Sequence, residues 1–233
     1  MKDEKHSHDS IQISPTMLAA QYQSFSGPIE IQTLPTPTLT SSTSDTDAIL
    51  LKVKATGVCR SDWHGWKGHD SDIIEHGLPF TPGHECSGII VQTGSNVQKC
   101  KVGQKVVVPF ILSCGVCREC CVGRNKPTVC EDQVQPGFTM QGSFAEYVRI
   151  TRADRNVCVL PEEGVDFVEA AALGCRFTTA YRAVVQQGKW GDLSCFADND
   201  TCVCAVFGCG GLGLSCVMIA KAIVTQIEQE HQS

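Results

Sequence analysis

The sequence predicts an α/β chain in which a β-rich part, folded as a small and partly open β-barrel, precedes the first strand–turn–helix unit of a second domain. Two observations predict this order. Over residues 17–160, short runs of β-forming residues are separated by glycine and proline. Later, the apolar run Cys202–Phe207 leads into a glycine-rich turn at 208–213, and apolar residues then recur at helical spacing over 214–223.

The β-rich part is expected over residues 17–165, behind a polar and disordered tail at 1–16. Its strands are expected at Met17–Tyr22, Ile29–Thr33, Ile49–Thr56, Glu85–Gly94, Lys105–Phe110, Phe144–Ile150 and Asn156–Leu160. Beyond Pro161 the pattern changes, and apolar residues at helical spacing predict helices at 167–173 and 178–185. Residues 166–233 are therefore expected to hold linking helices and the start of the second domain.

Charge and composition argue against several classes of function. The 233 residues carry a formal net charge of -6 and no basic run, which argues against nucleic acid or an anionic membrane as the main partner. The N-terminus lacks the apolar segment of a secretory signal, and no apolar run reaches the ~18 residues of a membrane span. We therefore expect a soluble cytoplasmic protein whose fifteen cysteines are reduced and available for metal.

Five cysteines lie within seventeen residues, between positions 114 and 130. Cys114, Cys117 and Cys120 form two successive C-x-x-C steps, and Cys130 follows on the far side of a glycine-containing loop. Zinc takes four thiolates at about 2.3 Å in a tetrahedron, and short cysteine spacings let one loop provide them. The alternatives are a disulfide knot or inert buried thiols. Cys121 is the further cysteine placed to compete for this metal.

Three residues that lie far apart in the sequence form a second candidate site, namely Cys59, His84 and Cys175. Taken singly, each has a simpler interpretation, as a buried thiol or a turn residue. Together they suit a catalytic metal whose ligands converge in three dimensions. Three protein ligands leave a fourth position for water or substrate.

Several motifs give the chain a resemblance to a known family: GVCRSDWH, PGHE, the cysteine run, QPGF, GSFAEY, GCRFTTAYRAV and GCGGLGLS. From Met17 to about Ala222 the chain resembles the zinc-dependent alcohol dehydrogenases of the medium-chain dehydrogenase/reductase superfamily. The resemblance implies a GroES-like catalytic domain joined to a Rossmann domain. It also implies one catalytic and one structural zinc ion per chain, and NAD or NADP as the cofactor.

The resemblance implies a set of metal ligands. Cys59, His84 and Cys175 resemble the ligands of the catalytic zinc, and Glu85 resembles the acidic neighbour that can approach this metal. Asp62 resembles the carboxylate that orients the His84 imidazole. The ligands implied for the structural zinc are Cys114, Cys117, Cys120 and Cys130.

The resemblance also implies residues for the reaction and for the cofactor. Ser61 and His64 resemble a proton relay that runs from a zinc-bound alcohol towards solvent, while hydride passes to the nicotinamide. Thr179 is implied to approach the nicotinamide, and Arg60 the pyrophosphate. The glycines that match the phosphate turn are Gly208, Gly210, Gly211 and Gly213.

The sequence departs from the family pattern in two places. Ten positions separate Cys120 from Cys130, where family members usually have eight, so the loop is expected to close on its metal with two extra residues. After Ala222 the family continues through a second strand that ends in an acidic residue. Here no β-like run leads into Glu228 and Glu230, which we expect in a solvated tail. More than ~100 residues of the dinucleotide domain are therefore expected to be missing.

These features predict a zinc-dependent, NAD(P)-linked alcohol dehydrogenase whose cofactor domain is incomplete and which is expected to be inactive alone. Its expected partners are a small alcohol or aldehyde and, for a complete subunit, further copies of itself. One alternative is a catalytically silent zinc-binding GroES-like module, or truncated isoform, that pairs with other subunits. A zinc-ribbon nucleic-acid binder would need basic surface that this acidic chain lacks.

Overall fold

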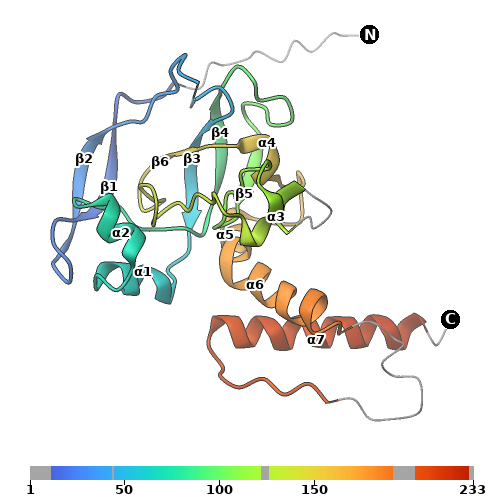
Figure 1. Ribbon diagram of the computed structural model, residues 1–233. Helices are drawn as coiled ribbons and strands as arrows, with labels where there is room; N and C mark the ends of the chain where they lie inside the picture. Colours follow the sequence, from blue (N-terminus) through green and yellow to red (C-terminus); the bar gives the residue numbers. More distant parts are fainter. Residues whose placement is uncertain (1–11, 44, 122–125, 191–202, 231–233) are drawn as a thin grey trace, which may run out of the picture.

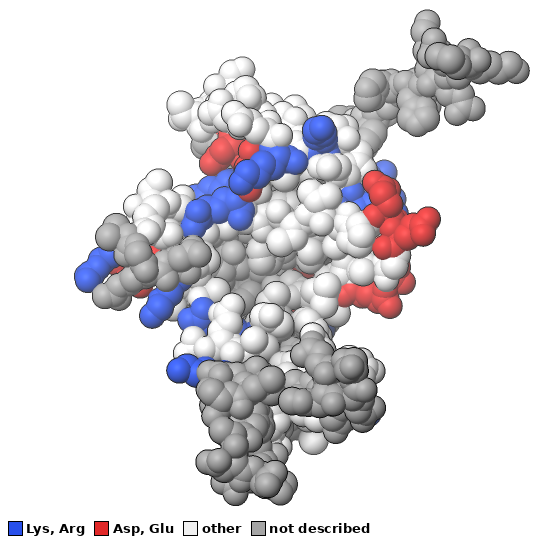
Figure 2. All heavy atoms as spheres, turned by 90° about the vertical axis from the view of Figure 1, so that its right-hand side faces the viewer, with Lys and Arg blue, Asp and Glu red and all other residues white. Residues whose placement is uncertain are grey.

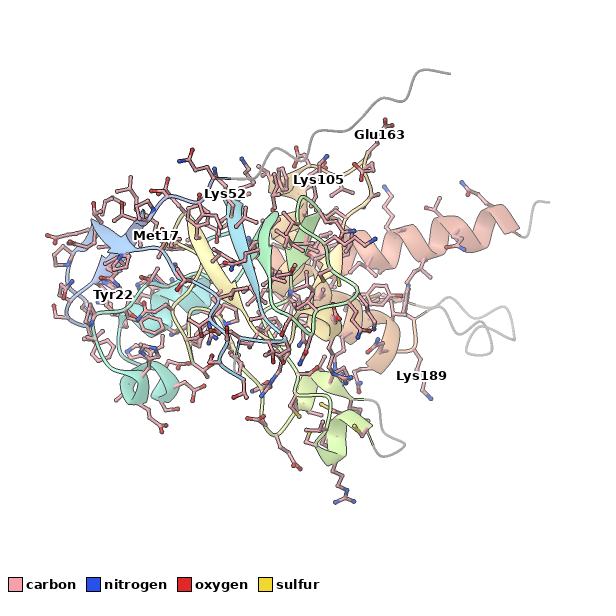
Figure 3. All side chains as sticks on the ribbon, turned by 90° about the horizontal axis from the view of Figure 1, so that it is seen from above. Met17, Tyr22, Lys52, Lys105, Glu163 and Lys189 are labelled. Atoms are coloured by element: carbon pink, nitrogen blue, oxygen red, sulfur yellow. The ribbon has the colours of Figure 1, made fainter. Side chains whose placement is uncertain are left out.

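The structure, a computed structural model, describes residues 12–43, 45–121, 126–190 and 203–230. Figure 1 shows a β-rich part from which helices α5 (Phe167–Ala172) and α6 (Thr178–Tyr181) lead towards α7 (Gly211–Glu230). Seen from above, α7 projects beyond the sheets (Figure 3). A packed β-rich part is therefore followed by a smaller helical part.

Two antiparallel sheets form the β-rich part. The strand bounds are β1 Thr16–Tyr22, β2 Ile29–Pro35, β3 Ile49–Thr56, β4 Cys86–Thr93, β5 Lys105–Val108, β6 Tyr147–Ile150 and β7 Cys158–Val159. One sheet pairs β1 with β2, and the other has the strand order β6-β3-β4-β5-β7. An isolated bridge between Ala19 and Ala145 connects β1 to the chain just before β6.

The edges of the larger sheet stay open. Strands β6 and β7 lie at its two ends and do not pair with each other within the described ranges. The sequence predicts a partly open barrel, and open antiparallel sheets followed by helices agree with that fold class. The strands correspond to the predicted runs, except that Asn156 ends helix α4 (Ala153–Asn156) and leaves β7 only two residues long.

The core lies between the inward faces of the central strands. Ile49 and Leu51 from β3 pack with Ile90, Val106 and Ile150, and all five side chains are fully buried. Burying each such side chain contributes about 1.5–3 kcal/mol before the loss of conformational entropy is counted. Because β3 and β4 form the centre of this core, the segments that leave their ends are held firmly. The candidate site lies at these ends.

A second apolar cluster supports the region of the short helices α1 (Arg60–Trp66) and α2 (Ser71–His76). Tyr22, Ile73, Phe80 and Phe138 form this cluster. Helix α2 begins after Asp70, whose Oδ1 accepts hydrogen bonds from the backbone N–H groups of its first turn. The remaining short helices of the β-rich part are α3 Arg118–Cys121 and η1 Pro127–Val129.

Helical conformation continues from α5 through two π-helical segments, η2 (Leu173–Phe177) and η3 (Arg182–Gln187), with α6 between them. A capping box formed by Asp166 and Glu169 fixes the start of α5. The sequence predicts two helices at 167–173 and 178–185, and the structure joins them through η2. A π-helical turn changes the direction of its side chains and is frequent at functional sites. Cys175 lies in this segment.

The end of the chain differs from the sequence-based expectation. Residues 203–207, predicted as a strand from Cys202 onward, pair with no other strand of the described residues, and the Phe207 side chain is 98% exposed; Cys202 itself lies outside these residues. Helix α7 begins at Gly211 and continues to Glu230, so the predicted solvated tail is helical there. Residues 221–230 contain lysine, alanine, glutamine and glutamate but no glycine or proline, and this composition lets the helix continue.

The N-terminal end shows a smaller difference. Residues 1–11 of the predicted tail lie outside the described residues. Ile13 packs against a cluster of buried side chains that includes Met17 and Leu50, and β1 begins at Thr16. Packed structure therefore starts upstream of Met17, where the sequence predicts a polar tail.

The surface carries charges of both signs. On the face shown in Figure 2, acidic side chains lie directly beside lysine and arginine side chains in some places, and uncharged surface separates other charged groups. Among the helices that the structure describes, none combines the length and the apolar character needed to cross a membrane.

A test of the core compares two leucines on neighbouring strands. Leu51 is fully buried in β3, whereas Leu18 in β1 is 50% exposed. We expect Leu51→Ala to lower the free energy of unfolding by about 2–5 kcal/mol, because it leaves a cavity between packed strands. Leu18→Ala, the matched control, should cost less than about 1 kcal/mol. Urea denaturation measures both changes, and equal effects would contradict this placement of the core.

Candidate metal centres

Four potential metal ligands from three parts of the chain meet at one end of the sheet. Cys59 precedes α1, His84 and Glu85 precede β4, and Cys175 lies in η2. The pairing of Thr56 with Cys86 brings the first two segments together, since these residues end β3 and begin β4. The ligand atoms of the four side chains all lie within 4.8 Å of one another. We call this group the mixed cluster.

The Asp62 carboxylate holds the mixed cluster in position. Its Oδ2 accepts a hydrogen bond from the backbone N–H of Cys59 at 2.9 Å. Its Oδ1 accepts two more, from the backbone N–H of Gly83 at 3.1 Å and from Nδ1 of His84 at 3.0 Å. With Nδ1 donating to Asp62, Nε2 is the His84 nitrogen left for a metal, which would displace any proton on it.

Two buried atoms of this cluster have no hydrogen-bond partner among the described residues: His84 Nε2 and Glu85 Oε1. Both side chains are essentially inaccessible to solvent, at 1% and 0% exposure. An unpaired buried polar atom costs free energy, so such atoms are rare unless a ligand or metal satisfies them. Two thiols, one imidazole nitrogen and a nearby carboxylate are the donor types that zinc prefers. The residues present therefore fit a metal.

The thiols and the imidazole influence one another's protonation. Burial by itself lowers the pKa of His84, but the neighbouring Asp62 and Cys59 side chains outweigh burial and raise this pKa to about 9. A hydrogen bond from Cys175 lowers the pKa of Cys59 to about 3, and the same contact raises the pKa of Cys175. One thiolate is therefore strongly favoured, and a bound cation would stabilise a second one.

A pocket of about 340 Å³ adjoins the mixed cluster. Its lining residues are Ser61, His64, Asp70, His84, Phe110, Gln135, Phe138 and Cys175. Ser61 Oγ lies 3.7 Å from Cys59 Sγ, while His64 is exposed, with its Nδ1 3.5 Å from Nδ1 of His69. The Ser61 hydroxyl and the His64 imidazole thus line a space that extends from the mixed cluster towards the surface. Such a space can accept a small molecule with one oxygen near the metal position.

Arg60 and Thr179, the two residues outside the glycine turn that are expected to contact the cofactor, do not line this pocket. Arg60 is exposed, and its guanidinium group lies 4.1 Å from the centre of the Trp63 ring. Thr179 is exposed in α6 and is not among the residues that line the pocket. The structure therefore does not bring either side chain into the mixed cluster.

The predicted phosphate turn has a geometry that requires glycine. Gly208 has a φ of +102°, a conformation that side chains with a Cβ rarely adopt. A Cβ at Gly213 would lie 1.9 Å from the Gly208 carbonyl oxygen. Gly211 is the first residue of α7, and Gly210 accepts the hydrogen bond from the N–H of Leu214. The turn thus brings bare backbone to the N-terminus of a 20-residue helix.

Sequence reasoning gave no role to several side chains around the mixed cluster. Phe110 and Phe138 lie with their ring centres 6.4 and 5.1 Å from that of His84. Arg176 Nη2 donates to Glu85 Oε2 at 2.9 Å. For Arg176 the sequence did offer a signal, because it is a charged residue directly after the candidate ligand Cys175 in an otherwise uncharged segment. The two phenylalanines gave no signal that separates them from core residues.

The second group of ligands consists of Cys114, Cys117, Cys120 and Cys130, which we call the four-cysteine cluster. All four Sγ atoms lie within 4.8 Å of one another. The separations are 4.0 Å between Cys114 and Cys120 and 3.8 Å between Cys117 and Cys130. A tetrahedron with metal–sulfur bonds of about 2.3 Å has edges of about 3.8 Å, so the spacing suits one zinc ion.

Backbone N–H groups donate hydrogen bonds that stabilise a thiolate in the four-cysteine cluster. The N–H groups of Val116 and Cys117 donate to Cys114 Sγ at 3.4 and 3.2 Å. These amide donors lower the pKa of the Cys114 thiol. The sulfur atoms are much further apart than the ~2.05 Å of a disulfide, and all cysteines of the described residues are free thiols, which argues against the disulfide knot.

Cys121 lies outside this cluster. It is exposed, and its Sγ donates to the Gly115 carbonyl oxygen. Helix α3 explains the difference, because it turns Cys120 inward and its neighbour outward. Residues 122–125 of the longer loop lie outside the described residues, but the loop still brings Cys130 to the other three sulfurs.

The alcohol dehydrogenase GroES-like domain family matches residues 45–162, just over half of the chain. This range contains the four-cysteine cluster and every residue of the mixed cluster except Cys175. The match therefore covers both candidate metal centres.

Individual relatives match over most of this chain. An alcohol dehydrogenase from Geobacillus stearothermophilus is 32% identical over 212 residues, covering 89% of this chain and 56% of that protein. The solved structure of the alcohol dehydrogenase TADH from Thermus sp. ATN1 has a TM-score of 0.74 at 27% identity, covering 89% of this chain and 55% of that one. A short chain alcohol dehydrogenase from E. coli CFT073, complexed with NADH, has a TM-score of 0.71 at 29% identity, covering 89% and 54%. The chain spans about half the length of these relatives.

The neighbouring pair Cys120 and Cys121 provides a test of the four-cysteine cluster. We expect Cys120→Ser to lower the number of tightly bound divalent metal ions by about one per chain, because it removes a thiolate from a closed site. Cys121→Ser is the matched control and should leave the metal content unchanged. Elemental analysis of protein purified under reducing conditions measures both. Loss of metal in Cys121→Ser alone would show that the neighbour is the ligand.

Proposed function

The chain belongs to the alcohol dehydrogenase GroES-like domain family, and from this premise we propose that it forms the zinc-binding catalytic part of an alcohol dehydrogenase-type oxidoreductase. The proposed reaction is hydride exchange between a small alcohol, or the matching aldehyde or ketone, and NAD or NADP. One observation carries the proposal. Cys59, His84 and Cys175 converge beside a pocket, with the buried His84 Nε2 lacking any partner among the described residues.

The proposed metals occupy both clusters, with about two zinc ions per chain. Cys59, His84 and Cys175 would hold the catalytic ion, with Glu85 within reach, and the four-cysteine cluster would hold the structural ion. When bound, the catalytic metal supplies Lewis acidity towards the substrate oxygen, and the nicotinamide exchanges the hydride. Asp62 keeps the His84 imidazole in the tautomer and orientation that this role needs.

The proposed proton path uses side chains that line the pocket. Ser61 Oγ, beside Cys59, would accept the proton of the substrate hydroxyl and pass a proton on to the His64 imidazole. His64 is exposed and would release that proton to solvent. Phe110 and Phe138, which line the pocket beside His84, would limit the access of water to its inner end.

The proposed cofactor site combines the glycine turn with the N-terminus of α7. Gly208, Gly210, Gly211 and Gly213 would let the pyrophosphate approach the backbone, with Arg60 as a further cation and Thr179 near the nicotinamide. The relative from E. coli complexed with NADH supports a nicotinamide cofactor. For the whole protein we propose a small alcohol or aldehyde as substrate, self-association into a homo-oligomer, and a cytoplasmic location.

A second candidate function is a catalytically silent zinc-binding module that pairs with other subunits. The observation that favours it concerns residues 203–207, directly before the glycine turn. Val203–Phe207 pairs with no strand of the described residues, so the glycine turn lacks the neighbouring sheet that holds such turns in place. The two candidates agree on the metals and differ in turnover.

Metal analysis combined with an activity assay separates the two candidates. The purified protein is expected to contain about two zinc ions per chain, and His84→Ala to lose one of them. Formation of NADH or NADPH with a panel of primary and secondary alcohols would support the oxidoreductase. A zinc-loaded protein without turnover would support the silent module. Metal-free protein, freshly prepared and reduced, would contradict both candidates.

Replacement of Ser61 tests the proton path in an active preparation. We expect Ser61→Ala to lower kcat/KM by about 10²–10⁴, because the first proton acceptor is removed. Zinc content should stay unchanged, since Ser61 is not a proposed ligand. Ser71→Ala, on the exposed first residue of α2, is the matched control. Equal activity of the two variants would exclude Ser61 from the path.

A further inference from the structure

Glu85 is the member of the mixed cluster whose part in metal binding the geometry leaves open. Its side chain is fully buried, and its Oε1 has no hydrogen-bond partner among the described residues. Gly57 closes off one side, since a Cβ there would lie 2.1 Å from Glu85 Oε2. The carboxylate is thus confined within 4.8 Å of the other three ligand atoms.

Arg176 binds this carboxylate through the same oxygen, Oε2. Its Nη2 donates a charge-assisted hydrogen bond to Glu85 Oε2 at 2.9 Å, and the Arg176 side chain remains 34% exposed. The stem of Arg176 lies against Gly211, where a Cβ would approach its Cδ to 2.4 Å. The arginine is therefore placed between the buried glutamate and the first residue of α7.

A carboxylate at this position has two possible partners. A zinc ion held by Cys59, His84 and Cys175 has one coordination position left, and a carboxylate oxygen is a good fourth ligand. If Glu85 took that position, the site would be closed, as in structural zinc sites. While the guanidinium group binds the carboxylate, the position stays available to an external oxygen or nitrogen ligand.

We propose that Arg176 is a positioning residue that withholds Glu85 from the metal and so keeps the fourth coordination position open. This inference rests on the proposed metal site and concerns its regulation. It predicts that removing the arginine charge closes the site through Glu85, while removing both side chains opens it again. If Arg176 only supported the fold, removing Glu85 as well would not reopen the coordination position.

The experiment uses cobalt as the metal and imidazole as the external ligand. The metal-free protein is loaded with Co²⁺, and its visible absorption is followed as imidazole is added. The four-cysteine cluster has no free position, so the imidazole-induced change reports the mixed cluster alone. No turnover is needed for this measurement.

The variants distinguish the effect of the Arg176 charge from that of the Glu85 carboxylate and from a general effect on folding. We expect Arg176→Met to weaken imidazole binding at least about 10-fold and to tighten binding of the second cobalt ion by about 10-fold. Arg176→Lys, Glu85→Gln and the double variant Glu85→Gln/Arg176→Met should all bind imidazole like the unaltered protein. Arg182→Met is the matched control, since it removes the same charge from η3, which lines a different pocket.

Three results would overturn the inference. Arg176→Met could bind imidazole as the unaltered protein does, or it could lose the second cobalt ion altogether, which would make the arginine a support of the site. The double variant could also remain as closed as Arg176→Met. If the unaltered protein binds no second cobalt ion, the proposed metal site fails as well, so the two failures are distinguishable.

Discussion

The hydrogen bonds accepted by the Asp62 carboxylate are the interaction on which the mixed cluster depends. One oxygen binds the backbone at Cys59, and the other binds both the backbone at Gly83 and the imidazole of His84. The carboxylate therefore ties the start of α1 to the segment that enters β4. It is 7% exposed, so these bonds compete little with water. A single side chain thus sets both the spacing and the tautomer of two candidate ligands.

Close backbone packing completes the support of His84. A Cβ on Gly137 would lie 2.6 Å from the Gly83 carbonyl oxygen, and a Cβ on Gly142 would lie 2.4 Å from the same atom. The N–H of Ser143 donates to that carbonyl at 2.9 Å. The motifs QPGF and GSFAEY, which carry no ligand, therefore have a physical role. Their glycines let two loops surround the segment that presents the histidine.

Sequence reasoning identified the elements that depend on local pattern and missed those that depend on tertiary packing. The runs of β-forming residues determine strands locally, and the C-x-x-C steps bring thiols together locally; the structure has both the strands and the close sulfur atoms. Neither the choice of Cys120 over Cys121 nor the contact between Glu85 and Arg176 could be read from spacing. The first depends on the direction of the short helix α3, and the second joins residues 91 positions apart. The unpaired run at Val203–Phe207 has β-forming residues, but a strand also needs a neighbour.

The two clusters differ in how far they depend on the fold. The four-cysteine cluster is contained in one stretch of seventeen residues with its own amide donors, so metal binding and local folding can support each other there. The mixed cluster has no such independence, because it needs the pairing of β3 with β4, the Asp62 bridge and the π-helical turn that carries Cys175. Its metal affinity should therefore follow the integrity of the whole β-rich part. The four-cysteine cluster can therefore assemble from local chain, whereas the mixed cluster assembles only with the β-rich part.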